Sequence, residues 1–182
     1  MRIDGQVAVV TGGGSGLGRG TARMLVAAGA RVAALDAQPQ GVQALADELG
    51  EAVLPITIDV RDGPQMEAAF ERVAAHWGEA RILVNCAGVL GVGKLLKRDG
   101  KARELDAFRR VIDINLVGTF NSIRVFAARI HAAQALDGGE RGVIVNTASV
   151  AAYEALSAQA AYGSSKGGVA GMTLPQIGRA HV

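Results

Sequence analysis

Short apolar runs alternate with longer segments of helical periodicity along most of this 182-residue chain. The runs are continuous rather than interrupted by polar residues, which is typical of parallel strands buried on both faces. We expect strands over residues 7–10, 31–35, 53–58, 82–84 and 143–145, and helices over residues 17–28, 42–49, 65–77, 104–129 (as one helix or two) and 162–174. This β-α order predicts an α/β domain with a doubly wound parallel sheet.

Composition excludes several classes of protein. The chain carries 19 basic and 17 acidic residues, and a net charge of +2 does not indicate a nucleic-acid-binding surface. It contains no run of 18 apolar residues, so we expect no membrane span. Its single cysteine, Cys86, cannot form an intrachain disulfide, and without a Cys/His cluster we expect no metal site. A reducing compartment fits, and since the N-terminus has no signal-peptide pattern we expect a cytoplasmic protein.

A glycine-rich turn at residues 11–18 separates the first expected strand from the first expected helix. Gly12, Gly16 and Gly18 allow positive φ angles and a close approach to a pyrophosphate, which the helix N-terminus attracts. Asp36 ends the next strand, where a carboxylate can bind a ribose 2′-hydroxyl. Asp36 would repel a 2′-phosphate, and residues 37–40 contain no basic side chain to offset it. The turn therefore predicts a dinucleotide site that prefers NAD to NADP.

Three polar side chains near the end of the chain form a candidate catalytic set. Tyr162 and Lys166 are four residues apart and so share one face of a helix. An ammonium beside a phenol favours the phenolate, which can act as general base in alcohol oxidation and as general acid in ketone reduction. Ser149 follows the fifth strand and can hydrogen-bond the substrate oxygen. Each of these residues, taken alone, commonly has a purely structural role. A serine after a strand, for example, often hydrogen-bonds within a turn.

Together these motifs resemble the short-chain dehydrogenase/reductase family, whose Rossmann-type fold they imply. The resemblance covers residues 1 to about 175, and the motifs occur in the family's order. They are T-G-x-x-x-G-x-G at 11–18, Asp-Val at 59–60, N-x-A-G at 85–88, Asn115, Ser149 and Y-x-x-x-K at 162–166.

The resemblance implies a role for each matching residue. It places Ser149, Tyr162 and Lys166 at the chemistry, and Asn115 in support of a water chain that relays protons through Lys166. A hydrogen bond at a helix kink is an alternative for Asn115 that is compatible with this role. For Cys86 we expect only backbone contact with the cofactor, its thiol being an inert, buried small hydrophobe. The implied cofactor contacts, besides Tyr162 and Lys166, are Gly12, Ser15, Gly16, Leu17, Gly18, Asp36, Asp59, Val60, Asn85, Cys86, Ala87 and Gly88.

Within the family, residues 141–152 and 159–175 resemble the type II 3-hydroxyacyl-CoA dehydrogenases, also called type 10 17β-hydroxysteroid dehydrogenases. This implies NAD-dependent oxidation of a 3-hydroxyacyl-CoA, with hydroxysteroids as side substrates, and a homotetramer formed through the helices near 104–129 and from 162 onward. A 3-oxoacyl-carrier-protein reductase is an alternative, although Asp36 argues against the NADPH that it would use. Another alternative is a non-catalytic nucleotide-binding module. The catalytic set argues against it because all three members are present, namely Ser149, Tyr162 and Lys166.

Residues 94–103 carry five basic side chains against one acidic one. They are either a landing site for the phosphates of coenzyme A or a solvated loop.

The last seven residues, 176–182, resemble no part of the family. Residues 177–182 match the translation of a common sequencing adapter, which ends in a stop codon. We therefore expect an NAD-binding domain over 1–175 with strands 1–5, a foreign tail, and no C-terminal strands of the family. Without a sixth strand, residues 143–145 would form an exposed apolar edge. We expect the chain as written to be a poorly soluble fragment without dehydrogenase activity.

Overall fold

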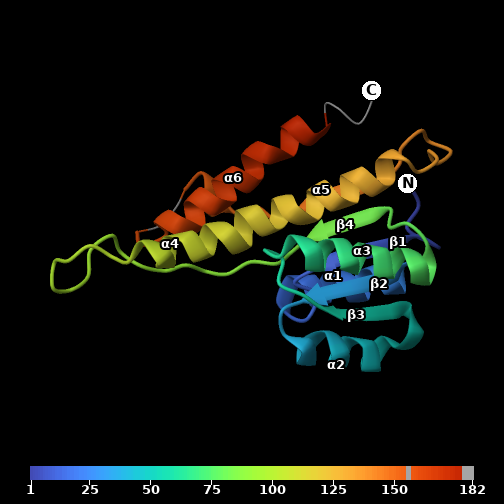
Figure 1. Ribbon diagram of the computed structural model, residues 1–182, viewed down its shortest axis with the longest axis horizontal. Coiled ribbons are helices and arrows are strands. Elements are labelled where there is room, and N and C mark those ends of the chain that lie inside the picture. Colours follow the sequence, from blue (N-terminus) through green and yellow to red (C-terminus); the bar gives the residue numbers. More distant parts are fainter. Residues whose placement is uncertain (155–156, 178–182) are drawn as a thin grey trace.

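Five parallel strands form a single sheet in the part of the chain that the structure describes (Figure 1). The structure is a computed structural model that describes residues 1–154 and 157–177, with side chains up to residue 173. Residues 178–182 of the adapter-like tail therefore lie outside the described residues. The sheet order is β3-β2-β1-β4-β5. The strands are β1 (Val7–Thr11), β2 (Arg31–Asp36), β3 (Val53–Thr57), β4 (Ile82–Asn85) and β5 (Val143–Asn146). The predicted doubly wound α/β fold is confirmed.

Helices cover both faces of this sheet. Helices α1 (Gly16–Ala27) and α2 (Pro39–Leu49) pack on one face, and α3 (Gly63–Trp77) and α5 (Gly118–His131) pack on the other. Successive side chains of β1 explain why the apolar run is continuous: Ala8 and Val10 face α1 and α2, whereas Val7 and Val9 face α3 and α5. A short 3₁₀ turn, η1 (Gly50–Ala52), leads into β3, and another, η3 (Val150–Ala152), follows β5.

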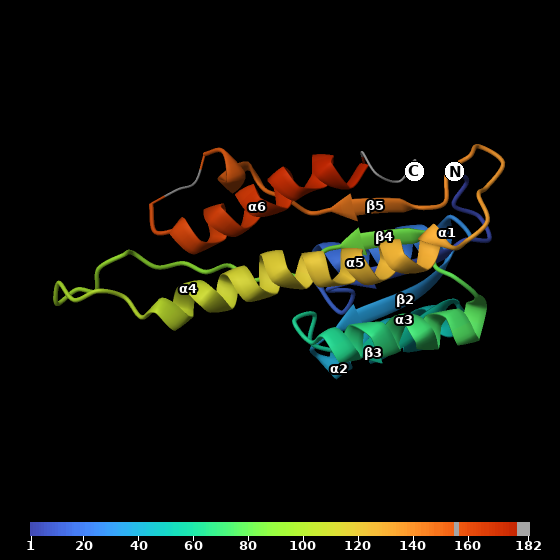
Figure 2. The ribbon, with the colours of Figure 1, turned by 45° about the horizontal axis from the view of Figure 1, so that its top comes forward.

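The segment expected as one helix or two is a single helical stretch with a π turn inside it. Helix α4 (Leu105–Ile112) continues through the π turn η2 (Asp113–Val117) into α5. Helix α6 (Ala160–Ile177) runs beside it, and α4 projects beyond the sheet (Figures 1 and 2). By length and composition Leu105–His131 could cross a membrane, but half of its most apolar window is buried inside the protein, as in a core helix.

Strand β5 forms one edge of the sheet as described, pairing with β4 (Figure 2). Its side chains alternate between the two faces. Ile144 packs against the cluster under α3 and α5, whereas Val143 and Val145 are 39% and 48% exposed. The face of β5 that carries these two valines is therefore the least covered part of the sheet.

The carboxyl ends of all five strands meet at one edge. The connection from β1 runs to β2 on one side, whereas β4 lies on the other side of β1, so the chain order reverses between β1 and β4. Crevices at such reversal points are where ligands bind to open α/β sheets.

Gly18 and Gly20 provide a matched test of the close packing at the start of α1. A Cβ atom on Gly18 would lie 2.1 Å from the carbonyl oxygen of Gly12, whereas a Cβ on Gly20 would meet no atom within 4 Å. We expect Gly18→Ala to lower the free energy of unfolding by about 1–3 kcal/mol. Gly20→Ala should raise it by up to about 1 kcal/mol, because alanine favours a helix over glycine. Pulse proteolysis in a urea series measures both, and equal effects would contradict the packing described.

Candidate active site

The glycine turn brings the end of β1 close to the segment that follows β4. Gly12 has a φ of +69°, and a Cβ there would lie 2.7 Å from the backbone nitrogen of Ala87. Ser15 precedes the first residue of α1, and no hydrogen bond from its side chain caps the helix. The free N–H groups at this helix start can therefore bind an anion. Leu17 is 74% exposed beside them.

Asp36 lies at the end of β2, directly over the glycine turn. Its Oδ2 accepts a hydrogen bond from the backbone N–H of Gly14 at 3.1 Å, and its Oδ1 accepts one from Gln38 at 3.0 Å. The carboxylate is half-buried and held by these two bonds. It is therefore fixed beside the turn that would hold the pyrophosphate, as a ribose contact requires.

Asp59 and Val60 follow β3 at the same edge. Arg61 donates a hydrogen bond to the Asp59 carboxylate at 2.9 Å, and this bond lowers the pKa of Asp59. The Val60 carbonyl accepts a hydrogen bond from Asn121 Nδ2 at 2.8 Å. These bonds position the segment after β3 against α5, at the place where the resemblance expects an adenine contact.

Asn85 is buried at the end of β4 and joins three strands. Its Nδ2 donates to Asn146 Oδ1 at 2.9 Å, and its Oδ1 accepts from Ser122 Oγ at 2.6 Å. Thr11 Oγ1 lies 3.4 Å from the same oxygen and accepts a hydrogen bond from the Ala87 N–H at 3.3 Å. The Asn85 side chain thus fixes the backbone that would face the cofactor.

Asn115 is fully buried inside the π turn Asp113–Val117. Its Oδ1 accepts from the backbone N–H of Val89 at 2.8 Å, and its Nδ2 donates to the Val89 carbonyl and to Ser165 Oγ, both at 3.0 Å. Ser165 Oγ in turn donates to the carbonyl of Tyr162 at 2.7 Å. Both N–H bonds of the amide are thus used within the protein, and the side chain holds α6 against the segment after β4.

Lys166 is the basic member of the predicted catalytic set, and it is 5% exposed. Its Nζ donates to the carbonyl of Thr147 at 2.6 Å and lies 5.9 Å from the centre of the Tyr162 ring. Burial lowers the pKa of Lys166, and the nearby Cys86 acts in the opposite direction. A Cβ on Gly88 would lie 3.7 Å from Nζ, so the ammonium is next to the segment after β4.

Ser149 follows β5 and begins the short turn Val150–Ala152. Its Oγ accepts a hydrogen bond from the backbone N–H of Ala151 at 3.2 Å. The hydroxyl is half-buried and keeps its own hydrogen to donate. Cys86 is likewise half-buried, and its Sγ accepts a hydrogen bond from Thr147 Oγ1 at 3.6 Å, so its thiol is less isolated than the sequence suggested.

Sequence reasoning missed several residues that position this site. Thr147 supplies the carbonyl that holds Lys166, and Ser165 connects Asn115 to the turn that carries Tyr162. Thr147 lies two residues before Ser149, and Ser165 directly precedes Lys166. Small polar residues at a strand end and inside an apolar helix are the signal that could have found them. Asn146, which binds Asn85, ends β5 and gave the same signal, whereas Ser122, which also binds Asn85, gave no local signal.

Comparison with known proteins places the chain in a family. The sequence model described as "short chain dehydrogenase" matches residues 6–175. The 3-hydroxyacyl-CoA dehydrogenase type-2 of Homo sapiens is 44% identical over 174 residues, which is 95% of this chain and 67% of the human protein. D-threitol dehydrogenase of Mycolicibacterium smegmatis is 39% identical over 176 residues, which is 95% of this chain and 64% of that protein.

A solved structure agrees with these relatives. The 3-hydroxyacyl-CoA dehydrogenase type-2 from Mycobacterium avium superposes with a TM-score of 0.88 at 36% identity, covering 96% of this chain and 69% of that one. The chain therefore belongs to the short-chain dehydrogenase family, whose members are oxidoreductases. It spans about two thirds of the length of its type-2 relatives.

Ser165 and its neighbour Ser164 test the role of the buried hydrogen bonds. Ser165→Ala would leave an N–H of the buried Asn115 amide without an acceptor, so we expect a loss of about 1–3 kcal/mol in the free energy of unfolding. Ser164 is exposed on the same helix, and Ser164→Ala should change stability by less than about 0.5 kcal/mol. Urea midpoints followed by pulse proteolysis give both values. Equal midpoints for the two variants would disprove the role of Ser165.

Proposed function

We propose that this protein is an NAD-dependent dehydrogenase that transfers a hydride between a 3-hydroxyacyl-CoA and the nicotinamide. One observation carries the proposal: the buried Lys166 ammonium lies beside Tyr162, at the sheet edge that also holds the glycine turn and Asp36. The similarity to 3-hydroxyacyl-CoA dehydrogenases type-2 supports the substrate. A hydroxysteroid is proposed as a side substrate.

The residues at the crevice fit a dinucleotide. A Cβ on Gly12 would fill the space against Ala87, and the start of α1 offers N–H groups to a pyrophosphate. Asp36 would bind the ribose, and the backbone of Asn85 to Gly88 would line the nicotinamide side. When bound, NAD supplies the hydride acceptor for the reaction.

The protein's own residues would move the proton. Tyr162 Oη would take the proton from the substrate hydroxyl, and Ser149 Oγ would donate a hydrogen bond to the same oxygen. Lys166 would stabilise the phenolate of Tyr162, because a buried ammonium is favoured when a negative charge forms next to it. Asn115 would position Tyr162 through Ser165. Asn115 would also support a water chain that relays protons through Lys166.

The extent and setting of the domain are proposals as well. We propose that residues 1–175 form the NAD-binding domain and that 176–182 are foreign to it; the family match over 6–175 supports the first part. A homotetramer through α4, α5 and α6 is supported by the exposed Phe108, Val117 and Phe120. The unpaired Cys86 supports a cytoplasmic setting.

Replacement of Asp36 tests the choice of cofactor. We expect Asp36→Ala to weaken NAD binding about tenfold to a hundredfold, since a hydrogen bond to a charged group contributes about 1.5–3 kcal/mol. It should also reduce discrimination against NADP. Asp47→Ala, which removes an exposed carboxylate on α2, should change neither. Fluorescence titration of NADH and NADPH measures both affinities in a full-length version, built as a chimera that continues after Pro175 with the remaining third of the human relative. Equal affinity of the chimera with Asp36 intact for the two would show that Asp36 is wrongly assigned and would favour a 3-oxoacyl-carrier-protein reductase.

The two tyrosines of the chain test the chemistry. We expect Tyr162→Phe to lower kcat by about 10²–10⁴, the usual contribution of a general acid or base, with little change in NAD affinity. Tyr153→Phe should leave the rate unchanged, because Tyr153 is 82% exposed. The rates are measured in a chimera that continues after Pro175 with the remaining third of the human relative. Near-normal turnover in the Tyr162 variant would refute the mechanism.

A further inference from the structure

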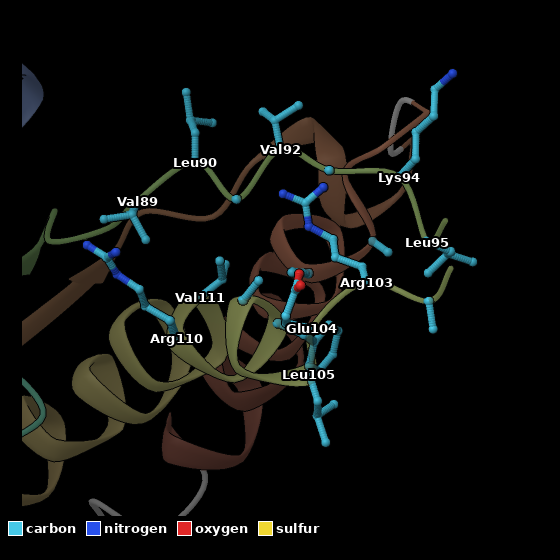
Figure 3. A pocket seen from close by; sticks show the side chains of 17 residues that line it. Val89, Leu90, Val92, Lys94, Leu95, Arg103, Glu104, Leu105, Arg110 and Val111 are labelled. Carbon is cyan, nitrogen blue, oxygen red and sulfur yellow. The ribbon is translucent and has the colours of Figure 1, made fainter. Parts of the chain in front are cut away.

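Two regions flank the crevice at the carboxyl edge of the sheet. Toward α4 lies a half-open cavity of about 610 Å³, lined by the segment after β4, by α4 and by the start of α6 (Figure 3). Under the proposed function this cavity belongs to the substrate. The other region is the segment after β3, the edge strand opposite β5, where a dinucleotide would place its adenine. This segment carries Arg61, to which the proposed function assigns no role.

Arg61 binds both oxygens of the Asp59 carboxylate. Its backbone N–H and its Nε donate to Oδ1 at 3.0 and 2.9 Å, Nε also lies 3.0 Å from Oδ2, and Nη2 donates to Oδ2 as well. The fork of a guanidinium matches the two oxygens of a carboxylate, so a pair of this kind fixes the orientation of both groups. The Asp59 carboxylate is therefore held in one orientation by a single neighbouring residue.

This ion pair contributes geometry more than stability. The side chains of Arg61 and Asp59 are 45% and 37% exposed, and exposed ion pairs contribute little to the free energy of unfolding. The hydrogen bonds from Arg61 also lower the pKa of Asp59, so the carboxylate stays ionised and accepts hydrogen bonds. The pair thus supplies an acceptor of fixed direction at the edge of the crevice.

The backbone of the same segment is fixed as well. The Asp59 N–H donates to Gln65 Oε1 at 3.1 Å, and the Asp59 carbonyl accepts from the Asp62 N–H at 3.0 Å. The carbonyl of Val60 is held by Asn121, but within the described part of the chain no residue accepts a hydrogen bond from the Val60 N–H. The segment therefore offers a fixed acceptor, the Asp59 carboxylate, next to a free donor.

An acceptor beside a donor matches the Watson–Crick edge of adenine. The 6-amino group of adenine donates a hydrogen bond, and the adjacent N1 accepts one. Hypoxanthine has a carbonyl in place of the amino group and a hydrogen on N1, so both positions are reversed. A carboxylate that cannot turn away would face the carbonyl oxygen of hypoxanthine, and unpaired polar groups of this kind weaken binding.

We propose that Arg61 is a positioning residue that fixes the Asp59 carboxylate and thereby makes the site select adenine over its 6-oxo analogue, hypoxanthine. The inference rests on the proposed function and deepens it, because it names the residue that sets the base specificity of the dinucleotide site. Arg61 acts through Asp59 and needs no contact of its own with the cofactor.

Fluorescence titration of the chimera with NADH and with reduced nicotinamide hypoxanthine dinucleotide tests the proposal. The unmodified chimera should bind NADH about tenfold to a hundredfold more tightly than the analogue, and Arg61→Ala should reduce this ratio to less than about threefold. Arg61→Lys should not restore the ratio, because an ammonium lacks the bidentate fork. Arg72→Ala is the matched control, since it removes an exposed arginine from α3, and it should leave the ratio unchanged. The urea midpoint of Arg61→Ala should equal that of the unmodified chimera.

A double variant separates action through Asp59 from direct contact with the cofactor. If Arg61 acts through Asp59, the variant with both Asp59→Ala and Arg61→Ala should bind NADH as tightly as Asp59→Ala alone. A further loss in the double variant, an equal loss for both nucleotides in Arg61→Ala, full rescue by Arg61→Lys or a changed ratio in Arg72→Ala would each overturn the proposal.

The same titration distinguishes failure of this inference from failure of the proposed function. An unmodified chimera that binds both nucleotides with equal affinity would overturn the role of Arg61 and leave the dinucleotide site in place. A chimera that binds neither nucleotide would overturn the proposed function, and the role of Arg61 with it.

Discussion

The buried amide of Asn115 joins three segments on which the candidate site depends. It binds the backbone of Val89 after β4, sits in the π turn between α4 and α5, and reaches Ser165 in α6. A fully buried amide must satisfy its hydrogen-bonding groups inside the protein, so few arrangements of these segments are allowed. Because Ser165 lies between Tyr162 and Lys166, the same bonds set where those side chains meet the crevice.

The parallel sheet supplies the other half of the site. Because all its strands are parallel, their carboxyl ends lie at one edge, and Asn85 ties β1, β4 and β5 together there. The glycine turn can approach the segment after β4 because Gly12 carries no Cβ, and α1 can begin against the Gly12 carbonyl because Gly18 carries none. The affinity for a cofactor and the stability of the sheet edge therefore depend on the same few contacts.

The charged side chains of the protein differ in whether they form ion pairs at the surface or are buried near the candidate site. Arg129 forms an ion pair with Glu79 at the partly exposed surface, and such pairs contribute little to stability. Lys166 is different because its ammonium is buried, and burial lowers its pKa. Its hydrogen bond to the Thr147 carbonyl holds it beside Tyr162, where a negative charge would favour the ammonium form. Around the neighbouring cavity, Glu104 forms an ion pair with Lys97, and Arg103 also helps to lower the pKa of this carboxyl.

The sequence by itself determined the strands, each of which begins at the predicted residue and ends within one residue of the prediction, because a continuous apolar run is a local signal. It also determined that the glycine turn, Asp36 and the residues after β4 share one edge, since parallel strands impose this. Tertiary structure alone decided that helix 105–131 contains a π turn, and that Thr147 and Ser165 hold Lys166 and Asn115. These features depend on contacts between residues far apart along the chain, such as the 50 residues that separate Asn115 from Ser165, and no local pattern encodes which distant partner packing will bring within hydrogen-bonding distance.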